Sequence, residues 1–143
     1  MDLQGINERD GLNMAASLFL LFNHRITRQQ ETAARLSLDV DRIINLPDDL
    51  KELWCQVPPE LSEIKYYLAP IRDWLKLNSI AGDYVLVQGD FGASYLMVTF
   101  AFENDLVPIY STTYREAIEK GNDDGSVKLT HQFQHHIFRR YGI

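Results

Sequence analysis

The stretch that decides the fold is Asp83-Tyr84-Val85-Leu86-Val87-Gln88-Gly89-Asp90-Phe91-Gly92-Ala93-Ser94. A short apolar run rich in β-branched residues ends at a Gly-x-x-Gly turn, and apolar residues then recur at helical spacing. This order predicts a strand, a tight turn and the N-terminus of a helix. In an open α/β sheet, ligands bind just beyond the carboxyl ends of strands. The free N–H groups that open the helix favour an anion, typically a phosphate.

The segments around this stretch predict further strands and helices. Thr27 and Gln30 have capping-box spacing and open a helix that runs to about residue 38. Pro47 begins a helix to about residue 57, and a helical pattern over 61–75 is kinked or split by Pro70. The helix after Ser94 is apolar nearly all round, so we expect it to be buried. Further strands are expected at 18–22, 42–46 and 107–110.

The last third of the chain changes from helical to alternating periodicity. Apolar and polar residues alternate over 127–141, which predicts a long, half-solvated strand. A turn at 121–125 lets residues 115–119 pair with it. The chain therefore predicts an α/β fold, a Rossmann-like three-layer domain with a mostly parallel central sheet and a C-terminal antiparallel hairpin. Residues 14–143 form this single domain, and 1–13 read as a flexible N-terminal extension.

Composition narrows the class of partner. The 143 residues carry a net charge of −6, which disfavours binding of long DNA or RNA but leaves room for a small ligand in a local pocket. No apolar run approaches the roughly 18 residues of a membrane span. The single cysteine, Cys55, excludes an internal disulfide and fits a reducing cytoplasm; we interpret it as a structural thiol.

Polar residues follow three of the expected parallel strands. These are Asn23-His24, Gln88-Gly89-Asp90 and Ser111-Thr112-Thr113, and Arg115 lies within reach of the same edge. Carboxyl ends of parallel strands share one edge of the sheet, so histidine, hydroxyls, a guanidinium and backbone N–H groups converge in a set that suits a phosphodiester. The alternatives are that the glycines only permit a tight turn and that His24 is a hydrogen-bonded surface residue.

His131, His135 and His136 raise the possibility of a zinc site. On a helix, the first two would share one face, as metal ligands do. On the predicted strand they lie about 13 Å apart at 3.3 Å per residue, and His135 and His136 point to opposite faces. We therefore expect neither a metal site nor a cofactor.

Several strings resemble a small CRISPR-associated family. They are residues 84–95 around Gly89-Asp90-Phe91-Gly92, Pro108-Ile109-Tyr110-Ser111-Thr112-Thr113-Tyr114-Arg115, the closing 138–141, and Phe22-Asn23-His24-Arg25-Ile26-Thr27. Together they resemble the stand-alone Csx proteins of type III CRISPR loci, specifically the "Csx twenty" group, over roughly residues 16–141. The resemblance implies a CARF-like domain that recognises cyclic oligoadenylates, with cyclic tetra-adenylate as the expected ligand. Related stand-alone proteins are ring nucleases, which linearise this messenger and end the antiviral response.

The resemblance assigns eleven positions to the site, and the backbone N–H groups expected to hold a phosphate add Ala93. Those expected to bind the ligand are Asn23, Gln88, Gly89, Phe91, Gly92, Ala93, Ser94, Thr112 and Thr113. His24, Asp90 and Arg115 are expected to act in the reaction. His24 is expected to be the general acid/base, Arg115 to stabilise developing charge, and Asp90 to face the sugar or base. Phe91 packs on an adenine or ribose, and the N–H groups of 92–94 hold the phosphate.

The expected reaction needs no metal, because the ribose 2′-OH attacks the adjacent phosphorus and leaves a 2′,3′-cyclic phosphate. An isologous homodimer would match the two-fold symmetry of a cyclic tetranucleotide. The alternatives are a non-catalytic sensor or sink for the same ligand, and an interaction protein in which the Gly-rich turn is only a turn.

Overall fold

A computed structural model of the chain describes the backbone of residues 15–143 and the side chains of these residues except those at positions 116, 118 and 131–133. The expected extension, 1–13, lies outside the described residues. The strands are β1 (Ala16–Phe22), β2 (Val40–Asn45), β3 (Tyr84–Gln88), β4 (Val107–Gly121) and β5 (Val127–Arg140). The helices are α2 (Arg28–Ser37), α3 (Asp48–Cys55), α4 (Ala69–Asn78) and α5 (Phe91–Glu103).

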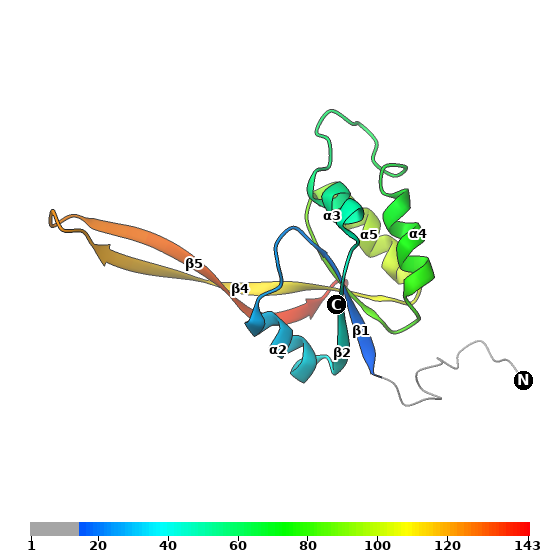
Figure 1. The fold of residues 1–143 in the computed structure, drawn as a ribbon, viewed down its shortest axis with the longest axis horizontal. Coiled ribbons are helices and arrows are strands. Elements are labelled where there is room, and N and C mark those ends of the chain that lie inside the picture. Colours follow the sequence, from blue (N-terminus) through cyan, green and yellow to red (C-terminus); the bar gives the residue numbers. More distant parts are fainter. Residues whose placement is uncertain (1–14) are drawn as a thin grey trace, which may run out of the picture.

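The five strands form one mixed sheet in the order β2-β1-β3-β4-β5. The first four are parallel to their neighbours, and β5 runs antiparallel to β4. Helices α3, α4 and α5 cover one face and α2 covers the other (Figure 1). The expected α/β fold with a parallel core and a C-terminal antiparallel hairpin is thus confirmed at this level. No helix in residues 15–143 is long and apolar enough to cross a membrane.

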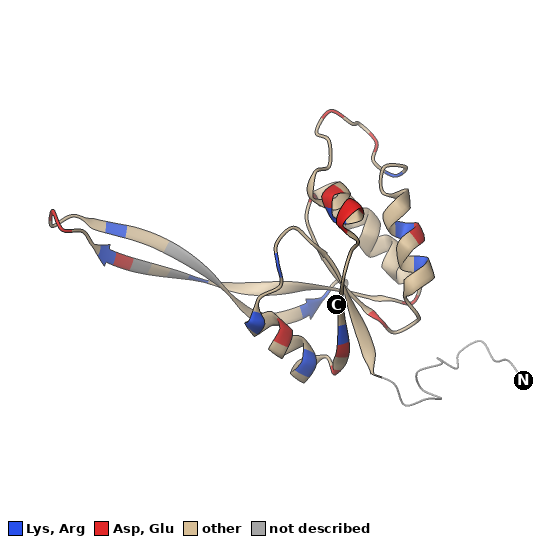
Figure 2. Ribbon diagram, in the orientation of Figure 1, with Lys and Arg blue, Asp and Glu red and all other residues tan. Residues whose placement is uncertain are grey.

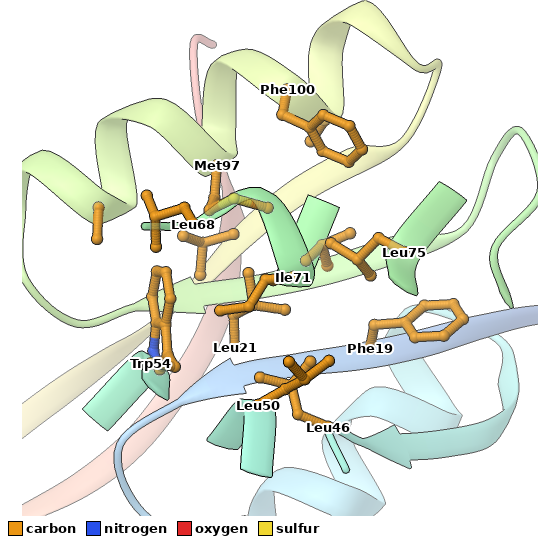
Figure 3. Packing of buried hydrophobic residues seen from close by; sticks show 14 of the residues in the cluster. Phe19, Leu21, Leu46, Leu50, Trp54, Leu68, Ile71, Leu75, Met97 and Phe100 are labelled. Carbon is orange, nitrogen blue, oxygen red and sulfur yellow. The ribbon is translucent and has the colours of Figure 1, made fainter. Parts of the chain in front are cut away.

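The larger hydrophobic core lies between the sheet and the three helices (Figure 3). Alternate residues of β1 and β3, such as Phe19, Leu21 and Val85, point into it, while Leu18, Leu20 and Leu86 point toward α2. Trp54 of α3 lies at its centre and is fully buried. This alternation is why strands covered on both faces appear in the sequence as continuous apolar runs.

Local signals set several element boundaries. Thr27 is the N-cap of α2: its hydroxyl accepts from the Gln30 amide at 3.1 Å, and the Gln30 side chain accepts from the Thr27 amide at 2.9 Å. This capping box confirms the prediction. Asp83 lies directly before β3 and connects the amino ends of β1 and β3. Its carboxylate accepts from the backbone N–H of Ser17 at 2.7 Å and from that of Ile80 at 2.8 Å.

Two predicted helices differ from the structure. The helix expected over 61–75 is wrong in its first half, because α4 begins only at Ala69 and Pro70 occupies its first turn. Proline has no N–H to donate, so it is better tolerated at a helix start than within one. The prediction that α5 is buried all round is also wrong, since Phe91, Tyr95 and Phe102 are exposed along it.

The last two strands extend far beyond the body of the sheet. β4 continues unbroken through 107–121, where we expected separate segments, and β3 accompanies it only as far as Ile109. From the Thr113–His135 pair to the Gly121–Val127 pair the two strands form a twisted ribbon that projects from the body (Figure 1). We call residues 113–135 the arm.

Candidate functional site

A cavity of about 480 Å³ opens at the carboxyl end of β3, beside the N-terminus of α5. Its lining combines aromatic side chains with a few polar groups: Gln88, Gly89, Phe91, Ser94, Tyr95, Val98, Tyr110 and Tyr141. Concave sites that are mainly apolar with a few placed polar groups are typical of small-molecule binding. Four of the predicted ligand-binding residues therefore line one cavity: Gln88, Gly89, Phe91 and Ser94.

The floor of this region explains why residue 89 is glycine. The indole N–H of Trp54 donates to the Gln88 carbonyl at 3.2 Å, which holds the ring against the chain. A Cβ at Gly89 would lie 2.9 Å from three indole atoms, whereas one at Gly92 would find its nearest neighbour at 3.4 Å. Close packing, rather than a positive φ angle, thus accounts for Gly89, since neither glycine is among the residues with positive φ.

The N-terminus of α5 is partly occupied by the chain itself. The Asp90 carboxylate accepts from the Ala93 amide at 2.9 Å as the N-cap, and the Ser94 amide donates to the Asp90 carbonyl at 2.8 Å. Two of the amides expected to hold a phosphate are therefore engaged within the helix. The Ser94 hydroxyl differs: its Oγ is buried and has no hydrogen-bond partner. Since Ser94 lines the cavity, a ligand is a natural partner for this hydroxyl.

Two tyrosines form the wall opposite α5. The Tyr141 hydroxyl donates to the Val87 carbonyl at 2.6 Å, and its ring packs on Tyr110 with centroids 4.8 Å apart. Burial, together with the neighbouring Tyr110, raises the pKa of Tyr141 above its ordinary value, so it remains a neutral donor at physiological pH. Arg139 donates to the Tyr110 hydroxyl at 2.8 Å. This wall is held rigidly by bonds that do not involve a ligand.

On the opposite face of the sheet, Gln88 begins a second polar network. Its side-chain oxygen accepts from the Ser111 amide at 2.8 Å. The Ser111 hydroxyl lies 2.5 Å from Nδ1 of His135 and accepts from the Gln30 side chain at 3.3 Å. The backbone carbonyl of His135 in turn accepts from Gln29 at 3.1 Å. This network fastens the base of the arm to α2.

His135 is the buried titratable group of this network. Burial lowers its pKa below the ordinary value, with a smaller contribution from neighbouring His136, so the imidazole is neutral at physiological pH. Its Nε2 is buried without a hydrogen-bond partner. His136 points to the other face and contacts the Tyr114 hydroxyl at 3.1 Å. The expected opposite orientation of these two histidines is confirmed.

The remaining predicted site residues lie outside the cavity lining. Asn23 and His24 are exposed just after β1, and the His24 ring rests edge-on against Phe22 with centroids 5.4 Å apart. Because Phe22 pairs with Gln88, His24 lies near the same edge of the sheet. The Thr112 hydroxyl fills the irregularity in the β4–β5 ladder by accepting from the Ile137 amide at 3.0 Å and donating to its carbonyl at 3.1 Å.

Arg115 and Thr113 belong to the arm rather than to the strand-end edge. Arg115 pairs with position 133, and its backbone lies about 13 Å beyond Ser111 at 3.3 Å per residue. The side chains of both residues are exposed. Within one chain, the structure therefore brings Gln88, Gly89, Phe91 and Ser94 together but separates them from Arg115.

Sequence reasoning missed several residues of this region. Tyr95, Val98, Tyr110 and Tyr141 line the cavity, and Gln30 and His135 form the network behind it with Ser111, which was expected at this edge of the sheet. The signal for Tyr95 and Val98 was available, since they follow Phe91 and Ser94, respectively, by four residues, about one helical turn. The burial of His135 depends on α2, which no local pattern reveals. In the described part of the chain, no group of three or more His, Cys, Asp or Glu residues is placed to hold a metal ion.

Comparison with known proteins identifies a matching family. The chain matches the model of the Uncharacterized protein MJ1673 family over residues 16–139. It is 47% identical over 124 residues to Uncharacterized protein MJ1673 of Methanocaldococcus jannaschii, which covers 87% of this chain and 95% of that protein. No solved structure matches the chain significantly. The matched region includes every described strand and helix apart from the last residue of β5, and the chain belongs to the Uncharacterized protein MJ1673 family.

Proposed function

We propose that this protein is a metal-independent ring nuclease that binds a cyclic oligoadenylate and linearises it, switching off type III CRISPR signalling in the cytoplasm. Cyclic tetra-adenylate is the proposed ligand, and the domain is proposed to be a Rossmann-like, CARF-like variant of the α/β fold. The observation that carries the proposal is the aromatic-lined cavity at the carboxyl end of β3, which is lined by Ser94, a residue whose buried hydroxyl has no hydrogen-bond partner.

The chemistry of the cavity suits a nucleotide. Phe91 and Tyr95 offer ring faces on which an adenine can stack, and base–aromatic stacking contributes about 1–3 kcal/mol per base. The Ser94 hydroxyl supplies a hydrogen-bonding group for a base, ribose or phosphate, whereas the Gln88 side-chain oxygen is engaged by the Ser111 amide on the other face of the sheet. The Asp90 carboxylate beside the helix N-terminus disfavours a phosphate there, so we assign the sugar or base to that side.

The proposed reaction uses the nucleophile that RNA itself carries. The ribose 2′-oxygen attacks the adjacent phosphorus and loses its proton to His24, the bond from phosphorus to the 5′-oxygen breaks, and that oxygen takes up a proton. The product is a linear oligoadenylate with a 2′,3′-cyclic phosphate and a 5′-hydroxyl. Holding the 2′-oxygen in line is the main source of rate in such an intramolecular attack. Arg115 is proposed to stabilise the negative charge that develops on the phosphate oxygens.

The test is incubation of the full chain with radiolabelled cyclic tetra-adenylate in excess EDTA, followed by chromatography and mass spectrometry. A linear product with a 2′,3′-cyclic phosphate supports the proposal, and dependence on added metal contradicts it. Ser94→Ala should weaken binding, and His24→Ala should slow cleavage by about 10²–10⁴-fold. His136→Ala, an exposed histidine on the other side of the arm base, is the matched control.

A second candidate function is binding of the same ligand without cleavage, as a sensor or sink that acts through a partner. The observation that favours it is that neither His24 nor Arg115 lines the cavity of a single chain. Titration calorimetry on the samples used for cleavage separates the two functions. Tight binding with intact ligand favours the sensor, and absence of binding overturns both candidates.

A further inference from the structure

The arm carries an apolar surface that its own chain leaves uncovered. Val127 and Leu129 are 62% and 56% exposed, and both lie on the same face of β5 because they are two residues apart. Lys128 between them points to the opposite face. An isolated two-stranded ribbon is at best marginally stable in water, so an arm of this length needs a surface to pack against.

A second uncovered surface lies on the body, at the mouth of the cavity. We call Tyr66, Phe91 and Tyr95 the aromatic patch; they are 87%, 95% and 71% exposed. Tyr66 and Tyr95 also line a neighbouring hollow of about 570 Å³. Grouped exposed aromatic side chains mark interaction sites, and tyrosine is enriched among the residues that dominate binding energy.

The arm does not reach the aromatic patch of its own chain, because it projects away from the helices that carry the patch (Figure 1). We propose that the arm packs on the aromatic patch of a second copy of this chain, against Tyr66 and against the parts of Phe91 and Tyr95 that do not face the cavity. In a two-fold dimer each residue contact occurs twice, so a single arrangement covers both arms and both patches.

The area involved favours this occupant. The nine register pairs of the arm span about 30 Å, and two strands are roughly 10 Å wide, so one face measures about 300 Å². Two arms on two patches bury four such surfaces, about 1,200 Å², which reaches the lower limit of stable, specific interfaces. Two arms packed on each other would bury only about 600 Å², the range of crystal-packing contacts.

The charges around the two surfaces are compatible with this packing. Glu119 pairs directly with Leu129, so it lies on the same face of the arm as the apolar side chains, and Arg115 lies on this face four residues earlier; exposed Glu63 and Lys65 lie beside the aromatic patch. Among the coloured residues of the arm, Figure 2 shows both Lys/Arg and Asp/Glu. Ion pairs at such a rim fix register more than they add affinity.

The inference goes beyond the proposed function, and its test uses no nucleotide. Light scattering and sedimentation on the full chain should give twice 16.5 kDa at high micromolar concentration. Leu129→Asp and Tyr66→Asp should each raise the dimer dissociation constant about 100-fold, about tenfold for each symmetry-related contact. Lys128→Asp on the other face of the arm, and Leu36→Asp at an exposed apolar position of α2, should leave it unchanged.

Disulfide trapping decides between the two ways of pairing. In a Cys55→Ser background, Leu129→Cys and Tyr66→Cys chains are mixed and oxidised, and we expect the crosslink between the two kinds of chain. A crosslink in Leu129→Cys alone would show arm-on-arm contact and overturn the proposal. A monomeric wild-type chain, or a dimer that Tyr66→Asp does not weaken, would overturn it as well. If the protein does not bind cyclic tetra-adenylate, the proposed function fails, but the measurements of dimerisation and crosslinking still test this inference.

Discussion

Replacing Gly89 with alanine tests the packing argument at the floor of the cavity. The added Cβ would lie 2.9 Å from three atoms of the Trp54 indole. Ordinary contacts between carbon atoms are about 3.5–4.0 Å, so the ring or the chain must move. Trp54 has little freedom to do so, because it is 1% exposed and its N–H donates to the Gln88 carbonyl at 3.2 Å.

Forcing extra atoms into a packed core costs about 1–3 kcal/mol of unfolding free energy. For a chain between the 100- and 150-residue classes, each kcal/mol lowers Tm by about 4 °C, so Gly89→Ala should melt about 4–12 °C lower. Gly92→Ala is the matched control, since its Cβ would meet only ordinary contacts at 3.4 and 3.5 Å. Alanine in a helix is favoured over glycine by about 0.5–1 kcal/mol, so the control should be neutral or stabilising.

Urea denaturation monitored by tryptophan fluorescence and circular dichroism gives both free energies. A double-mutant cycle with Trp54→Phe identifies the cause: the smaller ring leaves room for the Cβ, so Gly89→Ala should cost at least about 1 kcal/mol less in that background. Equal stability of Gly89→Ala and Gly92→Ala would refute the reasoning. So would a cycle in which the two substitutions are additive, because the loss would then come from backbone effects rather than from the indole.

Three further predictions concern single side chains. Burial lowers the pKa of His135 below 6.5, so as the pH falls the imidazole is protonated in the unfolded chain before it is protonated in the folded chain. The free energy of unfolding should therefore decrease as the pH drops below about 6.5. Urea midpoints measured from pH 5 to 7.5 should show this dependence reduced in His135→Gln and retained in His136→Gln. Asp90→Ala loses the N-cap of α5 and about 1 kcal/mol of stability. Asp90→Asn keeps the cap, and by removing a negative charge it should tighten phosphodiester binding measured by calorimetry. Thr27→Ala should cost about 1 kcal/mol in thermal melts, whereas Thr27→Ser should not.

Elements with strong local signals could be predicted from the sequence. The β-branched run before Gln88 gave β3 with its correct bounds, and the Thr27–Gln30 spacing gave the N-terminus of α2. Both signals act within a few residues, so no knowledge of the remaining chain is needed. The helical spacing over 61–68 failed because an irregular segment also buries apolar side chains at such intervals, as Leu68 does.

The site was predictable only where it follows from strand order. Parallel strands place Gln88 and the residues after it at one edge, which located the cavity. Its opposite wall is formed by Tyr110 of β4 and by Tyr141 just after β5, both far along the chain. The position of Arg115 depends on β3 ending at Gln88 while β4 continues, and that difference in strand length is a property of the assembled sheet.

The capping box of α2 has a consequence beyond its own helix. The Gln30 side-chain oxygen is committed to the Thr27 amide, so the Gln30 nitrogen must be the atom that donates to the Ser111 hydroxyl. The Ser111 hydroxyl therefore accepts from Gln30, and it has both the Thr112 carbonyl at 3.4 Å and Nδ1 of His135 within reach of its own proton. A helix cap near the beginning of the chain thus fixes one hydrogen bond of the hydroxyl that contacts a histidine near its end.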